Sequence, residues 1–261
     1  MAMTEQAQGA QTPRKSGAAH EFAEVVKTVV YALGIALVLR VLLFQPFTIP
    51  SASMVPNLLE GDYVVVSKYS YGWSKHSIPF SPPLFHGRIL GHAPQRGDVI
   101  VFKLPRDNRT DFVKRLIGLP GDHIDVKGGV VFLNGKPLKR EPLAPKTVDL
   151  GDGFTRMVDQ YRETLPSGKS YIINDFGPDG EMDDVGGYIV PEGHYFFMGD
   201  NRDNSLDSRA PEEIGVGYVP AENLEGKAQI VLLSWDKGAS IFLPWTWVTK
   251  ARPSRFFHLV Q

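Results

Sequence analysis

The chain has 261 residues, 43% of them hydrophobic, which is enough to bury the core of one large or two modest folded units. Its 28 Lys and Arg residues nearly balance 29 Asp and Glu residues, so no overall field attracts nucleic acid, and we expect no nucleic-acid partner. The absence of cysteine excludes disulfides, thiol nucleophiles, Fe–S clusters and Cys-based zinc sites together.

The N-terminal part combines a polar tail with the most apolar run of the chain. Residues 1–20 are small and polar, a composition that predicts a disordered tail. Residues 22–43 as a helix would span roughly 33 Å, about one hydrocarbon core, which predicts a single transmembrane helix whose Lys27 and Arg40 snorkel to opposite interfaces. Two alternatives stay open: a buried helix of a soluble protein, and a cleavable signal peptide with its cleavage site at residues 51–53.

The rest of the chain has an all-β pattern, because short β-branched runs are bounded by Gly, Pro, Asn and Asp. We predict mostly antiparallel sheets with strands at residues 63–71, 98–104, 111–118, 123–135 (a hairpin turning at Gly128-Gly129), 194–199 and 226–235. Residues 136–190 are polar and rich in Gly and Pro. We therefore expect a catalytic β core from residues 44–122 and 192–261, with residues 123–191 as an inserted, loop-rich second lobe.

The chemistry available to this chain is narrow. It has no Cys, no G-x-S-x-G elbow and no H-E-x-x-H motif, and its seven histidines suggest no metal site, so we expect neither metal nor cofactor. What remains is serine with lysine as the base, a known variant of the catalytic triad. Ser53 stands out, because Pro50 and Pro56 restrict the backbone around it in FTIPSASMVPNLLEGD, residues 47–62.

Lys114, in the predicted strand TDFVKRLIG, is the candidate base. Residues two apart on a strand share a face, so Phe112 and Leu116 flank Lys114 with apolar side chains. An ordinary lysine, with a pKa of about 10.4, is almost wholly protonated at neutral pH, but desolvation could lower that pKa by about 3 to 5 units. The alternative is a lysine that simply snorkels out of a half-buried strand.

Four ordered motifs decide between these readings. FTIPSASMVPNLLEGD, RGDVIVFKLP, DFVKRLIGLPGD and MGDNRDNSLDSR resemble the successive motifs of bacterial type I signal peptidase, the membrane-bound leader peptidase with a Ser/Lys dyad. The resemblance extends to the final ARPSRFFHLV. It implies a membrane-bound serine endopeptidase that removes signal peptides from exported preproteins after small, Ala-x-Ala-like residues.

The resemblance also implies a role for each matching residue. Ser53 is the nucleophile, Lys114 the general base, and Ser51 an oxyanion-hole hydroxyl beside the Ser53 N–H. Ser205 orients the lysine, with Asp207 and Arg209 as a supporting ion pair, and Met54 is the membrane contact. The positions that line the shallow substrate pockets are Phe47, Ile49, Leu58, Phe112 and Val113.

The implied partners are the signal peptides of preproteins and the lipid bilayer. Residues 47–51 and 111–114 are extended, and we expect them to pair with a substrate strand by β-augmentation. The implied location is the bacterial inner (cytoplasmic) membrane, as a single-pass protein with its catalytic part on the periplasmic or extracytoplasmic side. Arg14 and Lys15 give this orientation a weak positive-inside bias.

The chain departs from the family pattern at two positions. Ala52 stands where many members have glycine, so the turn must accept a negative φ, and Asn57 stands where many have threonine. Other hypotheses are a non-catalytic membrane-anchored β-domain that scaffolds envelope proteins and a self-cleaving Ser/Lys regulator. The aromatic C-terminal segment, residues 235–257, fits either packing at a membrane interface or a plain core segment.

Overall fold

The computed structural model describes residues 17–151, 154–239 and 242–260, which divide into two compact units, Met1–Arg40 and Val41–Gln261. The first 16 residues of the predicted disordered tail lie outside the described residues. Its last three residues are helical, so the prediction of disorder is wrong there. We call residues 41–261 the β unit.

The apolar N-terminal run forms α1, Ala18–Leu42, four residues earlier at its start and one residue earlier at its end than predicted. Glu21 in its first turn and Arg40 in its last turn both suit the helix dipole. Among the described residues, the part His20–Leu42 is long and apolar enough to cross a membrane, judged by length and composition. None of the side chains in its apolar window is buried, which does not fit the alternative of a soluble core helix.

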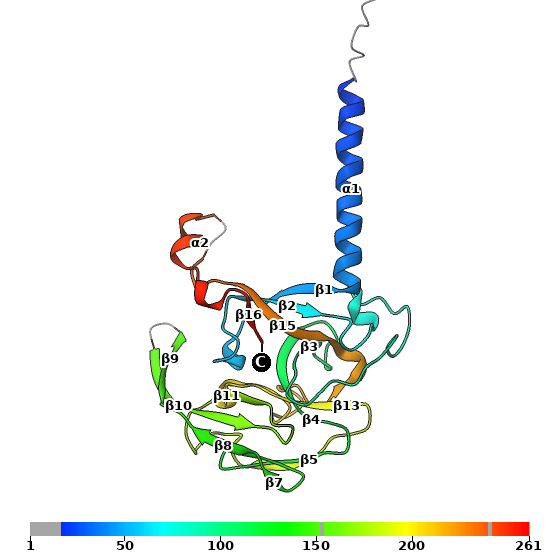
Figure 1. Ribbon diagram of the computed structural model, residues 1–261. Helices are drawn as coiled ribbons and strands as arrows, with labels where there is room; N and C mark the ends of the chain where they lie inside the picture. The colour runs from blue at the N-terminus through cyan, green and yellow to red at the C-terminus, as the bar shows by residue number, and fades with distance from the viewer. Residues whose placement is uncertain (1–16, 152–153, 240–241, 261) are drawn as a thin grey trace, which may run out of the picture. The chain divides into compact units, whose positions relative to one another are not determined.

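The β unit contains three sheets, and every pairing between their strands is antiparallel (Figure 1). The large sheet has the order β1 (Phe44–Thr48), β2 (Asp62–Ser67), β15 (Leu224–Ser234), β3 (Val99–Lys103), β4 (Asp111–Gly118), β13 (His194–Met198) and β14 (Val219–Pro220), with β16 (His258–Leu259) beside β15. The second sheet contains β11 (Ser170–Asp175), β10 (Phe154–Thr164), β8 (Lys139–Pro142) and β9 (Lys146–Gly151). The third contains β12 (Val185–Ile189), β5 (His123–Lys127), β6 (Val130–Leu133) and β7 (Lys136–Pro137). One short helix, α2 (Trp245–Thr249), follows β15.

The predicted all-β fold preceded by one apolar helix is confirmed. The predicted strand at residues 111–118 is β4 with the same bounds, and the predicted hairpin is β5 and β6. Its turn residues, Gly128 and Gly129, have φ of 53° and 73°, a left-handed backbone that glycine adopts without strain. The predicted strand at 63–71 is too long, because β2 ends at Ser67.

The second lobe is not loop-rich as expected, since residues 139–189 contain β8 to β12, including the eleven-residue β10. Charged residues within these strands masked the β-strand pattern in the sequence. Glu163 of β10 is completely buried and accepts hydrogen bonds from Arg140, Arg202 and the Tyr171 hydroxyl. A buried carboxylate with these partners occupies a core position that a hydrophobicity pattern assigns to solvent.

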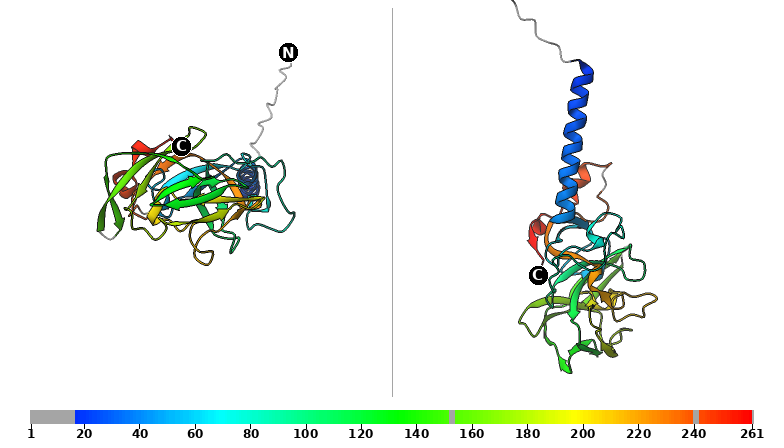
Figure 2. Two further views of the ribbon diagram at one scale, coloured as in Figure 1. Left: turned by 90° about the horizontal axis from the view of Figure 1, so that it is seen from below. Right: turned by 90° about the vertical axis from the view of Figure 1, so that its right-hand side faces the viewer.

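A shared hydrophobic cluster joins the second lobe to the large sheet. Ile117 of β4 and Phe196 of β13 pack in one cluster with Ile124 of β5 and Ile173 of β11. Within the β unit, β5, β7 and β8 lie at the opposite end from β1 and β2 (Figure 1), and Figure 2 shows the same order from a second side. The lobe therefore supports β4, the strand that carries Lys114.

We predict that Glu163→Gln destabilises the β unit by about 3 to 5 kcal/mol, because it leaves the buried cations of Arg140 and Arg202 without their shared carboxylate. Burial alone would raise the pKa of Glu163, but the charges of Arg202 and Arg140 and the hydrogen bonds from Arg202 and Tyr171 together lower it to about 2, so the carboxylate is ionised at neutral pH. Thermal or urea unfolding followed by circular dichroism measures the change. Glu141→Gln, at an exposed ion pair with Lys139, is the control and should stay within about 0.5 kcal/mol. Equal effects of the two variants would contradict the prediction.

Candidate active site

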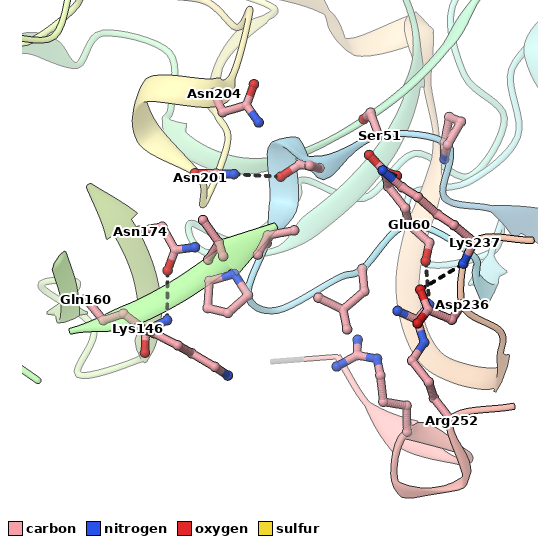
Figure 3. Close-up of a pocket in the computed structure, with 17 residues that line it drawn as sticks. Ser51, Glu60, Lys146, Gln160, Asn174, Asn201, Asn204, Asp236, Lys237 and Arg252 are labelled. Carbon is pink, nitrogen blue, oxygen red and sulfur yellow. Dashed lines mark hydrogen bonds and ion pairs between the residues drawn. The ribbon is translucent and has the colours of Figure 1, made fainter. Parts of the chain in front are cut away.

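Ser53 lies in a short 3₁₀ helix, η1 (Ala52–Met54), between the extended residue Ser51 and the C-cap Val55. The segment that follows β13 holds this turn from behind. The Asn201 N–H donates to the Ser53 carbonyl at 3.0 Å, and the Asn201 side chain donates to the Ala52 carbonyl, also at 3.0 Å (Figure 3). The turn that carries the candidate nucleophile is therefore fixed by contacts far away in the sequence.

Both departures from the family pattern have a structural explanation. Ala52 has the helical backbone of η1, which needs no glycine. The Asn57 amide donates to the Ile172 carbonyl and to Asp200, each at 2.7 Å, and so ties the loop after Ser53 to β11 and to the segment after β13. Threonine has no second donor for such a bridge.

Lys114 meets Ser53 in a buried pocket. Its Nζ donates to Ser53 Oγ at 2.5 Å, and the lysine is only 3% exposed. The Phe112 ring centre lies 5.6 Å from Nζ, so the apolar neighbour expected on this face is present. Burial lowers the pKa of Lys114 to about 8, while the charges of Asp207 and Asp200 oppose that shift.

Asp207 and Arg209 form the expected ion pair. Arg209 donates to both carboxylate oxygens of Asp207 at 2.9 Å, and both side chains are buried. Asp207 also accepts from the Gly199 N–H at 2.9 Å. The pair thus fixes the start of the MGDNRDNSLDSR motif and places a carboxylate charge near Lys114.

Ser205 is the exception among the predicted support residues. It is buried, but in the described part of the chain its hydroxyl has no hydrogen-bond partner, so no bond to Lys114 is present. Ser205 does pack against Gly199, where a Cβ would collide with the Ser205 hydroxyl and the Ser53 carbonyl. Sequence reasoning missed Gly199. The only available signal was the glycine itself, immediately before an aspartate in the motif.

A second buried ion pair was also missed. Arg115, the neighbour of Lys114, donates to both oxygens of Asp200 at 2.7 Å, and its guanidinium lies 4.0 Å from the centre of the Tyr171 ring. Because successive strand residues point to opposite faces, β4 presents Lys114 to the nucleophile and Arg115 to the second lobe. Arg115, next to the candidate lysine, looked like an ordinary surface cation in the sequence.

The structure corrects part of the predicted substrate and membrane contacts. Met54 and Leu58 are completely buried in one hydrophobic cluster, so the predictions that Met54 contacts lipid and that Leu58 lines a substrate pocket are wrong. The apolar character of both side chains is used by the core. Ile49 and Val113 belong to the same cluster and expose 2% and 9% of their surface. Phe47 and Phe112 are half-buried and remain accessible.

A groove of about 620 Å³ opens beside Ser51 and Ala52 (Figure 3). The Ser51 hydroxyl lies 3.4 Å from Ser53 Oγ, so the groove begins next to the candidate nucleophile. Neither Ser53 nor Lys114 lines the groove. In the described residues, no group of three or more His, Asp or Glu side chains could hold a metal ion.

Known proteins match most of this chain. The family model "Signal peptidase, peptidase S26" matches residues 22–235. A signal peptidase I of Rickettsia typhi is 39% identical over 87% of this chain and 89% of its own length, and one of Rickettsia prowazekii is 38% identical over the same shares. A crystal structure of a signal peptidase I from Enterococcus faecalis is 29% identical and covers 52% of this chain and 97% of its own, with a TM-score of 0.30, too low to support a statement on fold.

The chain is therefore similar to serine-type peptidases. It belongs to the signal peptidase family, peptidase S26. Membership of this family supports the removal of signal peptides by a serine peptidase, and the apolar helix α1 fits a membrane-anchored protein.

We predict that Lys114→Met stabilises the β unit by about 3 kcal/mol at pH 7, because the folded state no longer holds a buried ammonium whose pKa has fallen to about 8. Above its folded pKa the wild-type lysine loses its proton in the folded state first, so the wild type gains stability between pH 8 and about 10.5. The advantage of the variant should therefore shrink over this range. Urea unfolding at pH 7 and pH 10 measures both differences, with the exposed Lys136→Met as the control. A difference that is the same at both pH values would contradict a depressed pKa.

Proposed function

We propose that this chain is a membrane-bound serine endopeptidase that removes signal peptides from exported preproteins after small residues, with Ser53 as nucleophile and Lys114 as general base. The single observation that carries the proposal is the 2.5 Å contact between Lys114 Nζ and Ser53 Oγ inside a buried pocket. It joins the two atoms between which a proton must move when a serine attacks a peptide bond.

In the acylation step, the neutral amine of Lys114 takes the Ser53 hydroxyl proton while Oγ attacks the scissile carbonyl carbon. Ser53 is the second residue of η1, where helix N–H groups lack an intrahelical acceptor. That N–H and the Ser51 hydroxyl together stabilise the oxyanion. The lysine then gives its proton to the leaving amine as the C–N bond breaks, leaving the signal peptide as an ester on Ser53.

In the deacylation step, Lys114 removes a proton from a water molecule that attacks the ester. The ester bond to Ser53 breaks, Oγ regains a proton from the lysine, and the signal peptide leaves as a carboxylic acid that loses its proton to solvent. Both steps need a neutral amine at the start. With a pKa of about 8, about one lysine in ten is neutral at pH 7, against one in several thousand for an ordinary lysine.

Substrate recognition is proposed to use backbone pairing. In the described sheets, β1 pairs only with β2, and Asp111 to Lys114 of β4 pair only with β3, so each segment has a free edge close to the nucleophile. An extended substrate can hydrogen-bond to such an edge through its backbone whatever its side chains. Phe47 and Phe112 are half-buried, and we propose that their rings restrict the substrate to small side chains there.

Membrane association is proposed to rest on α1 and on an apolar patch of the β unit. Phe242, Trp245 and Val248 expose 88%, 63% and 82% of their surface around α2, where a core segment would hide them. Aromatic side chains are enriched at membrane–water interfaces. This patch replaces Met54 as the proposed lipid contact. We propose an inner-membrane location with the β unit on the periplasmic or extracytoplasmic side.

The first test is the cleavage of a preprotein by the full-length protein in detergent, with sequencing of the new N-terminus. We expect one cut after an Ala-x-Ala-like site and none with Ser53→Ala, because the variant lacks the attacking oxygen. The circular dichroism spectrum of the variant should match the wild type. An intact preprotein in the wild-type reaction would instead favour the non-catalytic scaffold.

The second test is the pH dependence of kcat/KM. Activity should rise with pH through about 8, because the neutral form of Lys114 is the base and its pKa is lowered by burial. Lys114→Arg should be inactive at every pH from 6 to 10, since a guanidinium stays protonated. A flat wild-type profile, or substantial activity in the arginine variant, would rule out Lys114 as the base.

A further inference from the structure

The groove beside Ser51 is not explained by the catalytic residues. Figure 3 shows two walls on either side of the turn that contains Ser51 and Ala52. The wall from the second lobe carries Lys146 of β9, Gln160 of β10 and Asn174 of β11. The facing wall comes from residues 59–60, 236–237, 252 and 255.

The position of the groove selects which part of a substrate enters it. The substrate strand before the scissile bond is assigned to the free edges of β1 and β4, and the side chains proposed there, Phe47 and Phe112, do not line the groove. Ser51 lines the groove, and its hydroxyl lies 3.4 Å from Ser53 Oγ, so the groove begins beside the candidate nucleophile. A substrate chain that passes the nucleophile continues beyond it, and the groove offers space for that continuation.

Two buried carboxamides at the groove have unused hydrogen-bonding atoms. Asn174 is completely buried, and its Oδ1 accepts from Gln160 at 2.8 Å while its Nδ2 has no partner in the described residues. Figure 3 shows this nitrogen turned away from Gln160. The Oδ1 of Asn201, which is 2% exposed, is likewise unpaired. Unsatisfied buried polar atoms are rare in folded proteins, and both of these residues lie in the wall of the groove.

The charges of the groove are unevenly distributed. On the facing wall, Lys237 pairs with Glu60 at 2.8 Å, and Arg252 and Arg255 both contact Asp62. The remaining acidic residue, Asp236, lies beside Lys237 on that wall (Figure 3). Lys146 is exposed on the wall of the second lobe, and among residues 17–151, 154–239 and 242–260 no ion pair or hydrogen bond involves its ammonium group.

On the basis of the proposed function, we propose that the groove binds the preprotein segment that follows the scissile bond, and that Lys146 makes it favour an acidic residue in that segment. The ammonium group of Lys146, which is exposed in the groove, pairs with a substrate carboxylate. Lys146 lines the groove and does not contact Ser53, so its proposed role is to determine specificity and not to take part in catalysis.

The experiment compares three preproteins with one signal peptide, carrying Asp, Asn or Lys at the second and third residues after the scissile bond. The full-length wild type in detergent at low salt should cleave the Asp substrate with a kcat/KM about threefold to tenfold above the Lys substrate, the size of one partly exposed ion pair. Lys146→Glu should reverse this order. Lys136→Glu, which changes an exposed lysine of the same lobe outside the groove, should keep the wild-type order.

A truncated substrate separates the groove from a general charge effect. A peptide ending at the first residue after the scissile bond should lose at least tenfold in kcat/KM, and Lys146→Glu should no longer alter its rate. Equal cleavage of the three preproteins, or an unchanged effect of Lys146→Glu on the truncated peptide, would overturn the groove proposal while Ser53-dependent cleavage stands. Failure of the wild type to cleave any preprotein would overturn the proposed function itself.

Discussion

The contact between Lys114 and Ser53 depends on keeping a lysine amine out of water. An amine at 3% exposure loses its hydration, and burial therefore lowers its pKa to about 8. The carboxylates of Asp207 and Asp200 limit that shift, since each charge favours the protonated form. The β unit thus holds a group that costs folding free energy at neutral pH, and the proposed role of Lys114 as a base rests on the same lowered pKa.

A series of buried ion pairs surrounds Lys114 and Ser53 and fixes the segments that contact them. Arg115 with Asp200 fixes the start of the segment that holds Ser53 from behind, and Arg209 with Asp207 fixes its end. Arg209 also donates to the Arg202 carbonyl, and the Arg202 side chain pairs with Glu163 of the second lobe. Each of these cations donates at least two hydrogen bonds to its carboxylate, the condition under which buried pairs are tolerated, and Arg202 Nε is the one buried donor among them without a partner in the described residues. The lobe is accordingly part of the support of the active site.

The sequence predicted best those features that depend on local geometry. β4 has the predicted bounds, and the alternation along it correctly places Phe112 beside Lys114. The Gly128-Gly129 turn follows from backbone chemistry in the same way. The pairing of Ser53 with Lys114, 61 positions apart, did not come from any local pattern and required the resemblance to a known family.

Features that depend on distant neighbours could not be predicted. Met54 follows the nucleophile and is apolar, which fits both a lipid contact and a core residue; only the fold around it assigns it to the core. β10 has the polar composition of a loop, but its buried carboxylate, Glu163, is neutralised by arginines from other segments. The hydroxyl of Ser205 lies against Gly199 and makes no hydrogen bond to Lys114. The motif MGDNRDNSLDSR, which contains Ser205 and Gly199, was recognised in the sequence, but this contact was not.

The site also places two unlike surfaces on either side of one 3₁₀ turn. On one side are the free edges of β1 and β4, to which the proposed function assigns the substrate before the scissile bond. On the other side is the groove, with unpaired amide atoms and a single cation without an ion pair among its described lining residues. η1 carries Ser53 between the two surfaces, and Asn201 donates to the carbonyls of both Ala52 and Ser53. Because Asn201 also lines the groove, one residue contacts both the groove and the turn that carries Ser53.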